Sequence, residues 1–342
     1  MTVPLDDLPP LSPAILEWLQ RAAEISAALP GLRSDEPTVR RRAERELSDL
    51  LAAEFTDPAP TGVEISDREV DGASGPCRAR VFRTGGAVGP QPTLLWLHGG
   101  GWTGGTIDEL LNDRICADRT LRSGVQIIAL EYRLAPEHPF PAPVDDAVAA
   151  LADLRRRADD LGIDAERLGV GGNSAGATVA ATTALRERDA GRRLHHQALE
   201  VLPAALRLVG ASGHRHRAAS GMQGAERLAD LYRAGAPLSA ASPLDAADHR
   251  GLAPALILAA EFDPLRDGAI AYARVLREAG VPVRLHVGPG HVHGSPGLTA
   301  RWEGARDWQA VFADELAIVY RTRSGDDASR RPATTAAATT DD

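Results

Sequence analysis

The sequence predicts an α/β fold built on a mostly parallel β-sheet with helices on both faces. Segments typical of strands and of helices alternate from about residue 63 to residue 320, a pattern that favours parallel strands joined by helices. Two of the strand segments, residues 93–97 (TLLWL) and 126–130 (QIIAL), are continuous apolar runs, as expected of strands buried on both faces. With 342 residues, 44% of them hydrophobic, the chain is long enough to bury a large core.

Two helices are predicted before the sheet, within residues 11–55. Apolar residues of the first helix share one helix face, since they recur at helical spacing: Ile15, Leu16, Leu19, Ala22 and Ala23. The second helix is predicted over residues 36–53, and Pro30 and Gly31 separate the two.

The first half of the sheet begins with two predicted strands, residues 64–70 and 78–82, joined by a glycine-rich turn. The two apolar strands follow. A helix is predicted over residues 145–158, with Asp145 and Asp146 near its positive N-terminal end. A short strand at residues 168–171 then leads into a helix at residues 175–186.

The second half of the sheet is interrupted by residues 194–242, where the pattern is irregular. Residues 197–202 are a candidate strand, although Glu200 lies inside it, and residues 225–232 a helix. Alternation returns with strands at 255–260 and 283–287 and helices at 268–280 and 301–320. Residues 321–342 contain almost nothing apolar beyond alanine, so we expect a disordered tail.

Composition excludes several classes of function. The net charge is −9 and is spread along the chain, with no basic stripe interleaved with aromatic residues, so nucleic acid is not an expected partner. All 38 basic residues are arginine. Cys77 and Cys116 are expected to be free thiols. Residues 1–10 lack the features of a signal peptide, and no apolar run reaches the roughly 18 residues of a membrane helix. We therefore expect a cytoplasmic protein that does not bind membranes.

The first motif with chemical meaning is a G-x-S-x-G centred on Ser174. The motif alone is weak, but it lies between a predicted strand and a predicted helix. In that context it forms a sharp elbow that exposes the serine hydroxyl, and Gly172 and Gly176 avoid collisions with neighbouring backbone. The motif predicts a nucleophilic serine.

The second motif, HGGGW at residues 98–102, follows the TLLWL strand directly. Its glycines, Gly99, Gly100 and Gly101, allow backbone N–H groups to face a ligand without side chains in the way. Acyl transfer needs such donors, because the tetrahedral intermediate carries a negative charge on oxygen. His98 itself is expected to be structural.

Candidate acid and base residues follow two later strands. Asp263 comes after the strand at 255–260, whereas Asp267 is expected to cap the next helix. His293 comes after the strand at 283–287, with His291 as the alternative. No carboxylate or cysteine stands at metal-ligand spacing from these histidines, so no metal is expected. The order serine, acid, histidine along the chain is the order of α/β-hydrolase triads.

These motifs resemble the hormone-sensitive-lipase-like esterases, the bacterial type IV branch of the α/β-hydrolases. The resemblance rests on HGGGW (98–102), YRLAPEHPFPAPVDDA (132–147), GGNSAGA (171–177), DPLRD (263–267) and PGHVHG (289–294), within residues 63–320. It implies an eight-stranded, mostly parallel sheet in a catalytic domain at residues 56–320. It also implies a small helical cap at residues 1–55, with part of 194–242 as a possible addition to that cap.

The resemblance also implies the roles of individual residues. Ser174 is similar to the family's nucleophile, Asp263 to its acid and His293, which is followed by glycine, to its base. Gly100, Gly101 and the N–H of Ala175 resemble the oxyanion-hole donors, and Gly99 permits the turn. The implied function is hydrolysis of short- to medium-chain acyl esters through an acyl-enzyme, without a cofactor.

The sequence departs from the family in places. Asn173 replaces an aspartate before the serine, and we expect its side chain to point away from the chemistry. Residues 194–242 diverge in the region that normally shapes the acyl pocket and the dimer edge, which leaves substrate preference and a homodimer open. An amidase, a lactone hydrolase and a non-catalytic small-molecule-binding homologue remain as alternatives to the esterase.

Overall fold

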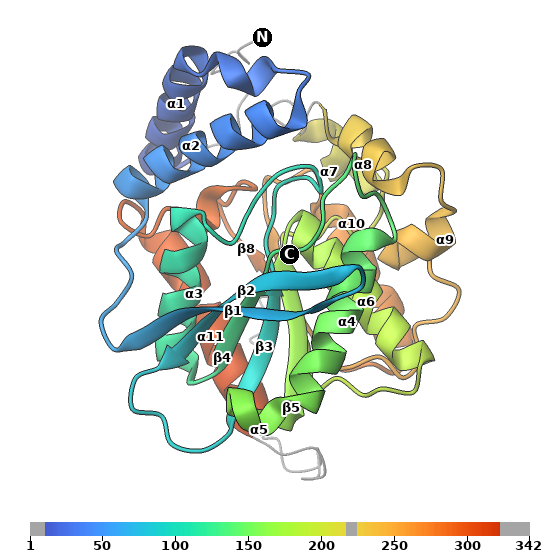
Figure 1. Cartoon of the computed structure of the whole chain (residues 1–342). Helices are drawn as coiled ribbons and strands as arrows, with labels where there is room; N and C mark the ends of the chain where they lie inside the picture. The colour runs from blue at the N-terminus through green and yellow to red at the C-terminus, as the bar shows by residue number, and fades with distance from the viewer. Residues whose placement is uncertain (1–10, 217–223, 322–342) are drawn as a thin grey trace, which may run out of the picture.

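An eight-stranded sheet forms the centre of the molecule (Figure 1). The computed structural model describes residues 11–216 and 224–321. The strand order is β1-β2-β4-β3-β5-β6-β7-β8. The bounds are β1 Val63–Gly72, β2 Gly75–Thr84, β3 Gln91–Leu97, β4 Gln126–Leu130, β5 Ile163–Asn173, β6 Gln197–Glu200, β7 Ala255–Ala260 and β8 Val283–Gly288. β1 and β2 are antiparallel, β2 pairs antiparallel with β4, and all other pairs are parallel. The predicted mostly parallel, eight-stranded sheet is confirmed.

Helices cover both faces of the sheet, as predicted. α3 (Leu110–Ser123) and α11 (Glu303–Arg321) pack on one face, against strand residues such as Leu94 and Trp96. α4 (Ala142–Arg156), α6 (Ala175–Asp189) and α10 (Arg266–Glu278) pack on the other, against Leu95 and Leu97. Successive residues of β3 thus enter opposite cores, because side chains alternate across a strand. Each apolar strand is therefore buried on both faces.

α3 is a helix that the sequence analysis did not predict. Its buried residues are Asn112, Cys116, Ala117, Arg119 and Thr120, so an apolar stripe with helical spacing is missing. The helix ends at Gly124, which has a positive φ of 70° as expected of a glycine after a helix. The described residues also form four shorter helices: α5 (Ala158–Leu161), α7 (Gly210–Arg215), α8 (Ala225–Arg233) and α9 (Leu238–Ala241).

Two N-terminal helices lie across the top of the molecule in Figure 1. α1 (Pro13–Ala28) and α2 (Pro37–Phe55) are joined by a short 3₁₀ turn, η2 (Pro30–Arg33). Arg41 of α2 donates to the backbone oxygens of Thr103 and Ala135, which follow β3 and β4. Ile15 and Phe55 share a small apolar cluster with Val292, after β8. The two helices therefore lie against loops at the carboxyl ends of the parallel strands.

The remaining predictions about the fold concern the tail, the irregular segment, the two cysteines and membrane-spanning helices. Of the predicted tail, residues 321–342, Arg321 is the last residue of α11, and residues 322–342 lie outside the described residues, as do residues 217–223 of the irregular segment. Cys77 in β2 and Cys116 in α3 are both buried free cysteines, as predicted. Among the described helices none combines the length and the apolar composition needed to cross a membrane.

Candidate active site

The predicted serine, aspartate and histidine lie at the carboxyl ends of three parallel strands in one half of the sheet. Ser174 follows β5, Asp263 follows β7 and His293 follows β8. The carboxyl ends of parallel strands share one edge of the sheet, and ligands of α/β folds bind outside that edge. The topology alone therefore brings together three residues that are far apart in the sequence.

Ser174 stands on a strained turn between β5 and α6. Its φ of 50° and ψ of −124° lie in a region that side-chain-bearing residues seldom adopt. The turn is possible because two glycines leave room: an added Cβ at Gly172 would come within 2.6 Å of the carbonyl oxygen of Leu97, and one at Gly176 would overlap the same oxygen. The N–H of Ser174 donates to the carbonyl of Glu200 at 2.8 Å, which ties the elbow to β6.

His293 connects the serine with the aspartate. Its Nε2 lies 2.9 Å from Ser174 Oγ and its Nδ1 lies 2.7 Å from Asp263 Oδ2. Since a carboxylate only accepts, Nδ1 carries the proton and Nε2 accepts from the serine hydroxyl. Asp263 is 1% exposed, and its other oxygen accepts from the N–H of Leu265 at 2.9 Å. The carboxylate is therefore held in place from both sides.

The electrostatics of the site favour a charged imidazole. Burial lowers the pKa of His293, but the charge and the hydrogen bond of Asp263, together with the charge of Glu200, outweigh it. The net result is a pKa raised above the usual 6.5. Proton transfer from Ser174 to His293 is therefore easier than to a histidine without the carboxylate.

The glycine loop places bare backbone amides beside Ser174. Gly100 and Gly101 have positive φ values of 118° and 59°, and Gly101 and Ala175 line a cavity together with Ser174. Gly99 and Gly100 line a second cavity that also contains Ser174. Within the described residues, nothing accepts a hydrogen bond from the N–H groups of Gly100, Gly101 or Ala175. These amides are free to bind an oxygen that carries negative charge.

His98, the first residue of the glycine motif, is a structural residue in this fold. It is buried, its ring stacks on Tyr132 with centroids 4.3 Å apart, and its Nδ1 lies 2.8 Å from the carbonyl oxygen of Gly99. The Tyr132 hydroxyl donates to the His98 carbonyl at 2.6 Å. Burial lowers the pKa of His98, so its ring is neutral. It shapes the loop and lies outside the serine–histidine–aspartate arrangement.

The first histidine of the PGHVHG motif, His291, lies apart from the serine. His291 is buried, with Nδ1 2.8 Å from Ser295 Oγ and Nε2 3.1 Å from the carbonyl oxygen of Gly304. Burial lowers its pKa to about 4. Both ring nitrogens are occupied, so His291 fixes the loop that carries His293. In the described ranges, 11–216 and 224–321, no group of three or more His, Cys, Asp or Glu is arranged to hold a metal ion.

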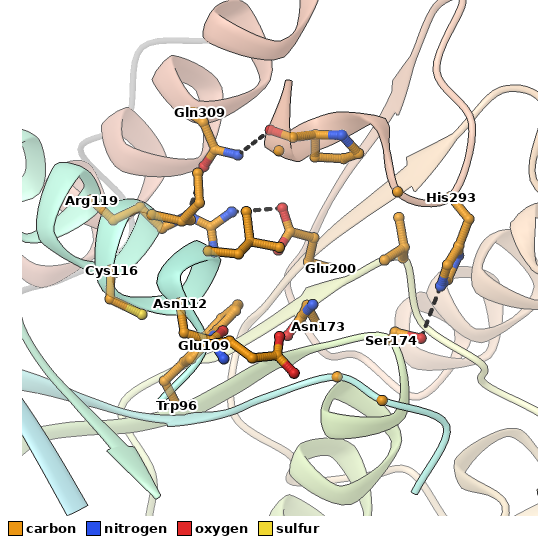
Figure 2. A pocket seen from close by; sticks show the side chains of 18 residues that line it. Trp96, Glu109, Asn112, Cys116, Arg119, Asn173, Ser174, Glu200, His293 and Gln309 are labelled. Atoms are coloured by element: carbon orange, nitrogen blue, oxygen red, sulfur yellow. Dashed lines mark hydrogen bonds and ion pairs between the residues drawn. The ribbon is translucent and has the colours of Figure 1, made fainter. Parts of the chain in front are cut away.

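Two expectations about polar side chains are wrong. Asp267 does not cap α10: it accepts from the N–H of Ser212 at 2.9 Å and pairs with Arg266, so it fastens the segment after β6 to α10. Asn173 does not point away from the chemistry, because its side chain lines the same cavity as Ser174 (Figure 2). The cause is the elbow, which aims consecutive side chains at the cavity.

The two cavities beside Ser174 differ in chemistry. The larger, of about 250 Å³, extends from Ser174 and His293 toward α3. The smaller, of about 60 Å³, lies under α8 and is mostly apolar. Its apolar lining includes Trp102, Leu206, Leu208, Leu228 and Leu265. Two limbs of a substrate can therefore leave the serine in different directions.

The larger cavity has a polar wall that the sequence analysis missed (Figure 2). Arg119 of α3 pairs with Glu200 of β6 at 2.6 Å, and both are buried. Glu200 also accepts from the indole of Trp308 at 2.6 Å, and Arg119 donates to Gln309 at 2.8 Å. The one signal in the sequence was Glu200 inside an apolar strand; its partner, 81 residues away, could not be located.

Comparisons with known proteins agree with the fold. A family profile described as the α/β hydrolase fold matches residues 94–296. The chain is 36% identical over 298 residues to an ethyl acetate hydrolase of Pseudomonas putida, covering 83% of this chain and 91% of that one. It is 35% identical over 285 residues to the carboxylic ester hydrolase LipN of Mycobacterium tuberculosis, covering 77% and 72%.

Solved structures give the same result. The crystal structure of an α/β-hydrolase enzyme from the metagenome of Lake Arreo, Spain, superposes with a TM-score of 0.82 at 33% identity. That match covers 91% of this chain and 99% of the other. The profile, the sequence relatives and the superposition together show that this chain belongs to the α/β-hydrolase family, in its hormone-sensitive-lipase-like branch of carboxylesterases.

Proposed function

We propose that this protein is a serine carboxylesterase in which Ser174 is the nucleophile, His293 the general base and Asp263 the residue that orients the base. One observation carries the proposal. His293 bridges Ser174 and Asp263 at 2.9 and 2.7 Å beside backbone amides that have no partner within the described residues. Membership in a family whose relatives are named esterases supports it.

The first half of the reaction forms an acyl-enzyme. Ser174 Oγ attacks the ester carbonyl while His293 Nε2 takes the hydroxyl proton. Asp263 stabilises the imidazolium that results. The carbonyl oxygen becomes an oxyanion and accepts from the free amides of the glycine loop and of Ala175. The tetrahedral intermediate then collapses, and His293 donates its proton to the departing alkoxide.

The second half releases the acid. His293 takes a proton from water, and the hydroxide attacks the acyl carbon within the same ring of amides. Collapse returns the serine oxygen, which is protonated by His293. Every proton is passed through one imidazole, and the cycle requires no cofactor.

The acyl range belongs to the proposal as well. The larger cavity, of about 250 Å³, is below the roughly 300–1,000 Å³ of pockets for drug-sized ligands. This size supports short- to medium-chain esters. We further propose that α1 and α2 act as a cap over the site, since they lie against the loops that carry the glycine motif and His293.

The test is turnover of para-nitrophenyl acetate and butyrate by the wild type and by Ser174→Ala. We expect the substitution to lower kcat by about 10⁴-fold or more, because removal of the nucleophile leaves only binding and the oxyanion donors. Equal turnover by both proteins would contradict the proposal. A fluorophosphonate that labels the wild type and not the variant distinguishes an activated serine from the non-catalytic binding homologue.

The amidase and lactone hydrolase alternatives use the same three residues. Matched ester, amide and lactone substrates with a common acyl group separate them by kcat/KM.

A cytoplasmic location is proposed because Cys77 and Cys116 are both unpaired thiols, which is typical of a reducing compartment. Cell fractionation checks the location, and light scattering after gel filtration checks the homodimer.

A further inference from the structure

The wall of the larger cavity presents hydrogen-bond acceptors. Glu200 uses one carboxylate oxygen, Oε1, for both Arg119 and Trp308. Within the described part of the chain its second oxygen, Oε2, accepts no hydrogen bond. Glu109 likewise uses Oε2 for Ser48 at 3.0 Å, and its Oε1 accepts none among the described residues. Both residues line the cavity that contains Ser174.

Asn112 adds a third acceptor to this wall. Its Nδ2 donates to the carbonyl of Thr106 at 2.7 Å, which fixes the orientation of the amide. The Oδ1 atom therefore remains as an acceptor, and no described residue donates to it. Figure 2 shows Glu109, Asn112 and Glu200 on the part of the cavity away from the Ser174–His293 pair.

Most donors on the same wall are already used. Arg119 donates through Nε to Gln309 and through Nη2 to Glu200. Its guanidinium stacks over Phe312 at 3.7 Å and lies 5.0 Å from the Trp96 ring. The Nη1 atom is enclosed and has no partner in the described structure. Gln309 donates to the carbonyl of Pro296 at 2.8 Å. Among the described residues, free acceptor oxygens therefore remain on Glu200, Glu109 and Asn112, and the amide of Asn173 lines the same cavity.

A hydrocarbon chain is a poor occupant of such a wall. It would displace water from two carboxylates and an amide oxygen without replacing the lost hydrogen bonds, which is unfavourable. The smaller apolar cavity under α8 suits a hydrocarbon limb instead. The larger cavity thus presents free acceptors among apolar side chains such as Leu111 and Ile115, whereas the smaller cavity is mostly apolar.

We propose that the larger cavity binds a limb of the ester that donates hydrogen bonds, a hydroxyl or a protonated amine, to Glu200, Glu109 and Asn112. The inference rests on the proposed esterase function and names its substrate class. Glu200 is paired with Arg119, and burial raises the pKa of Glu109 to about 7, so a protonated amine gains charge complementarity where Glu109 is ionised. The apolar cavity takes the other limb of the same ester.

The experiment compares pairs of esters that differ in one group. Hydrolysis by the full chain is measured as the release of acid at constant pH. In the alcohol limb the pairs are 2-hydroxyethyl with propyl acetate, and 2-(dimethylamino)ethyl with 3-methylbutyl acetate. In the acyl limb they are ethyl 3-hydroxypropanoate with ethyl butanoate, and ethyl 3-(dimethylamino)propanoate with ethyl 4-methylpentanoate. Each kcat/KM is divided by the rate of hydroxide-catalysed hydrolysis of the same ester, which removes intrinsic reactivity.

We expect the donor ester to exceed its alkyl partner by about tenfold or more in one of the two limbs, as for one hydrogen bond to a charged group. A larger ratio for the amine pair than for the hydroxyl pair identifies charge as the stronger selector. Preference for the alkyl esters in both limbs would overturn the proposal while leaving the esterase function intact. If no ester is hydrolysed and the fluorophosphonate does not label Ser174, the esterase function itself fails.

A variant pair locates the effect. Glu109→Leu removes one acceptor and its charge from the cavity, and we expect the donor-to-alkyl ratio to fall by about threefold or more. Glu46→Gln, on the exposed side of α2, is the matched control and should keep the wild-type ratio. A ratio that is unchanged in Glu109→Leu would overturn the assignment of this cavity. Circular dichroism confirms that both variants are folded.

Discussion

At the scale of single residues, the proposed mechanism makes His293 the group whose protonation decides activity. It must be neutral to accept the serine proton and charged to return a proton to the leaving group. Asp263 serves both states, because it fixes the ring through Nδ1 and stabilises the charge that forms. The raised pKa of His293 follows from this one carboxylate more than from any other neighbour.

The raised pKa predicts the acid limb of the pH–rate profile. Below the pKa the imidazole is protonated and cannot accept, so kcat/KM falls as the pH falls through it. Since the pKa of His293 is raised, we expect the midpoint above pH 6.5. Asp263→Asn removes the charge that raises it, so the midpoint should move to lower pH while kcat drops about 10⁴-fold. A midpoint that stays in place in the variant would show that Asp263 does not set the pKa.

Stability at the residue scale depends on the buried pair of Arg119 and Glu200. Arg119→Met leaves a buried carboxylate without its cation, and we expect a loss of about 3–5 kcal/mol of unfolding free energy. The double variant Arg119→Met/Glu200→Gln has no charge at these two buried positions and keeps an acceptor for Trp308. It should recover a large part of the loss in urea denaturation. A double variant as unstable as the single one would mean that packing of Arg119, and not its charge, matters.

At the scale of elements, apolar strands are the most predictable parts of this chain. β4 and β7 have the bounds predicted from sequence, because each is buried on both faces and flanked by polar turns. α3 escaped prediction because the face it buries carries Asn112 and Arg119 in place of an apolar stripe. Helix propensity reflects the local preference of each residue, whereas the side chains of Asn112 and Arg119 are buried by contacts with residues distant in the sequence.

The elbow between β5 and α6 gives a prediction at the same scale. Gly176→Ala places a Cβ against the carbonyl oxygens of Leu97 and His98, which are backbone atoms of β3 and its loop. We expect a loss of about 1–3 kcal/mol or failure to fold. Gly268→Ala in α10 is the control, since its Cβ would meet Val209 only at ordinary contact distance. Urea denaturation should show no loss there, or a gain of about 0.5–1 kcal/mol.

At the scale of the whole molecule, the N-terminal helix α1 contacts the loop that carries His293. A Cβ on Gly294 would come within 2.6 Å of the ring of Trp18 in α1. The φ of Gly294 is −90°, so alanine is allowed by the backbone and any cost comes from Trp18. The contact therefore couples the position of α1 to the position of His293.

A double-mutant cycle tests this coupling. Gly294→Ala should lower kcat/KM and destabilise the protein by about 1–3 kcal/mol, because the added methyl group overpacks the interface. Trp18→Ala/Gly294→Ala should restore much of both quantities, since the colliding ring is gone. Steady-state kinetics and urea midpoints give the coupling energy. Additive effects of the two substitutions would show that the contact does not transmit between cap and loop.

Some residues of the site could be predicted from the sequence and others could not. Ser174, Asp263 and His293 were located because each follows a strand and because their order matches the fold. The walls of the larger cavity could not be predicted. Glu109 directly precedes α3, Arg119 lies within α3 and Glu200 ends β6, and these residues meet only through tertiary packing. The predicted orientation of Asn173 was wrong for a different reason, because the sequence indicates the elbow but not the direction in which its side chains project.

The positions of the three residues along the chain have a consequence for synthesis on the ribosome. Ser174 is translated long before residue 293, and β8 is the last of the described strands along the sequence. An emerging chain therefore holds a serine without its proton acceptor and is chemically inert. Under the proposed mechanism, hydrolysis begins only after β8, at the edge of the sheet, and the loop that carries His293 have been translated and folded.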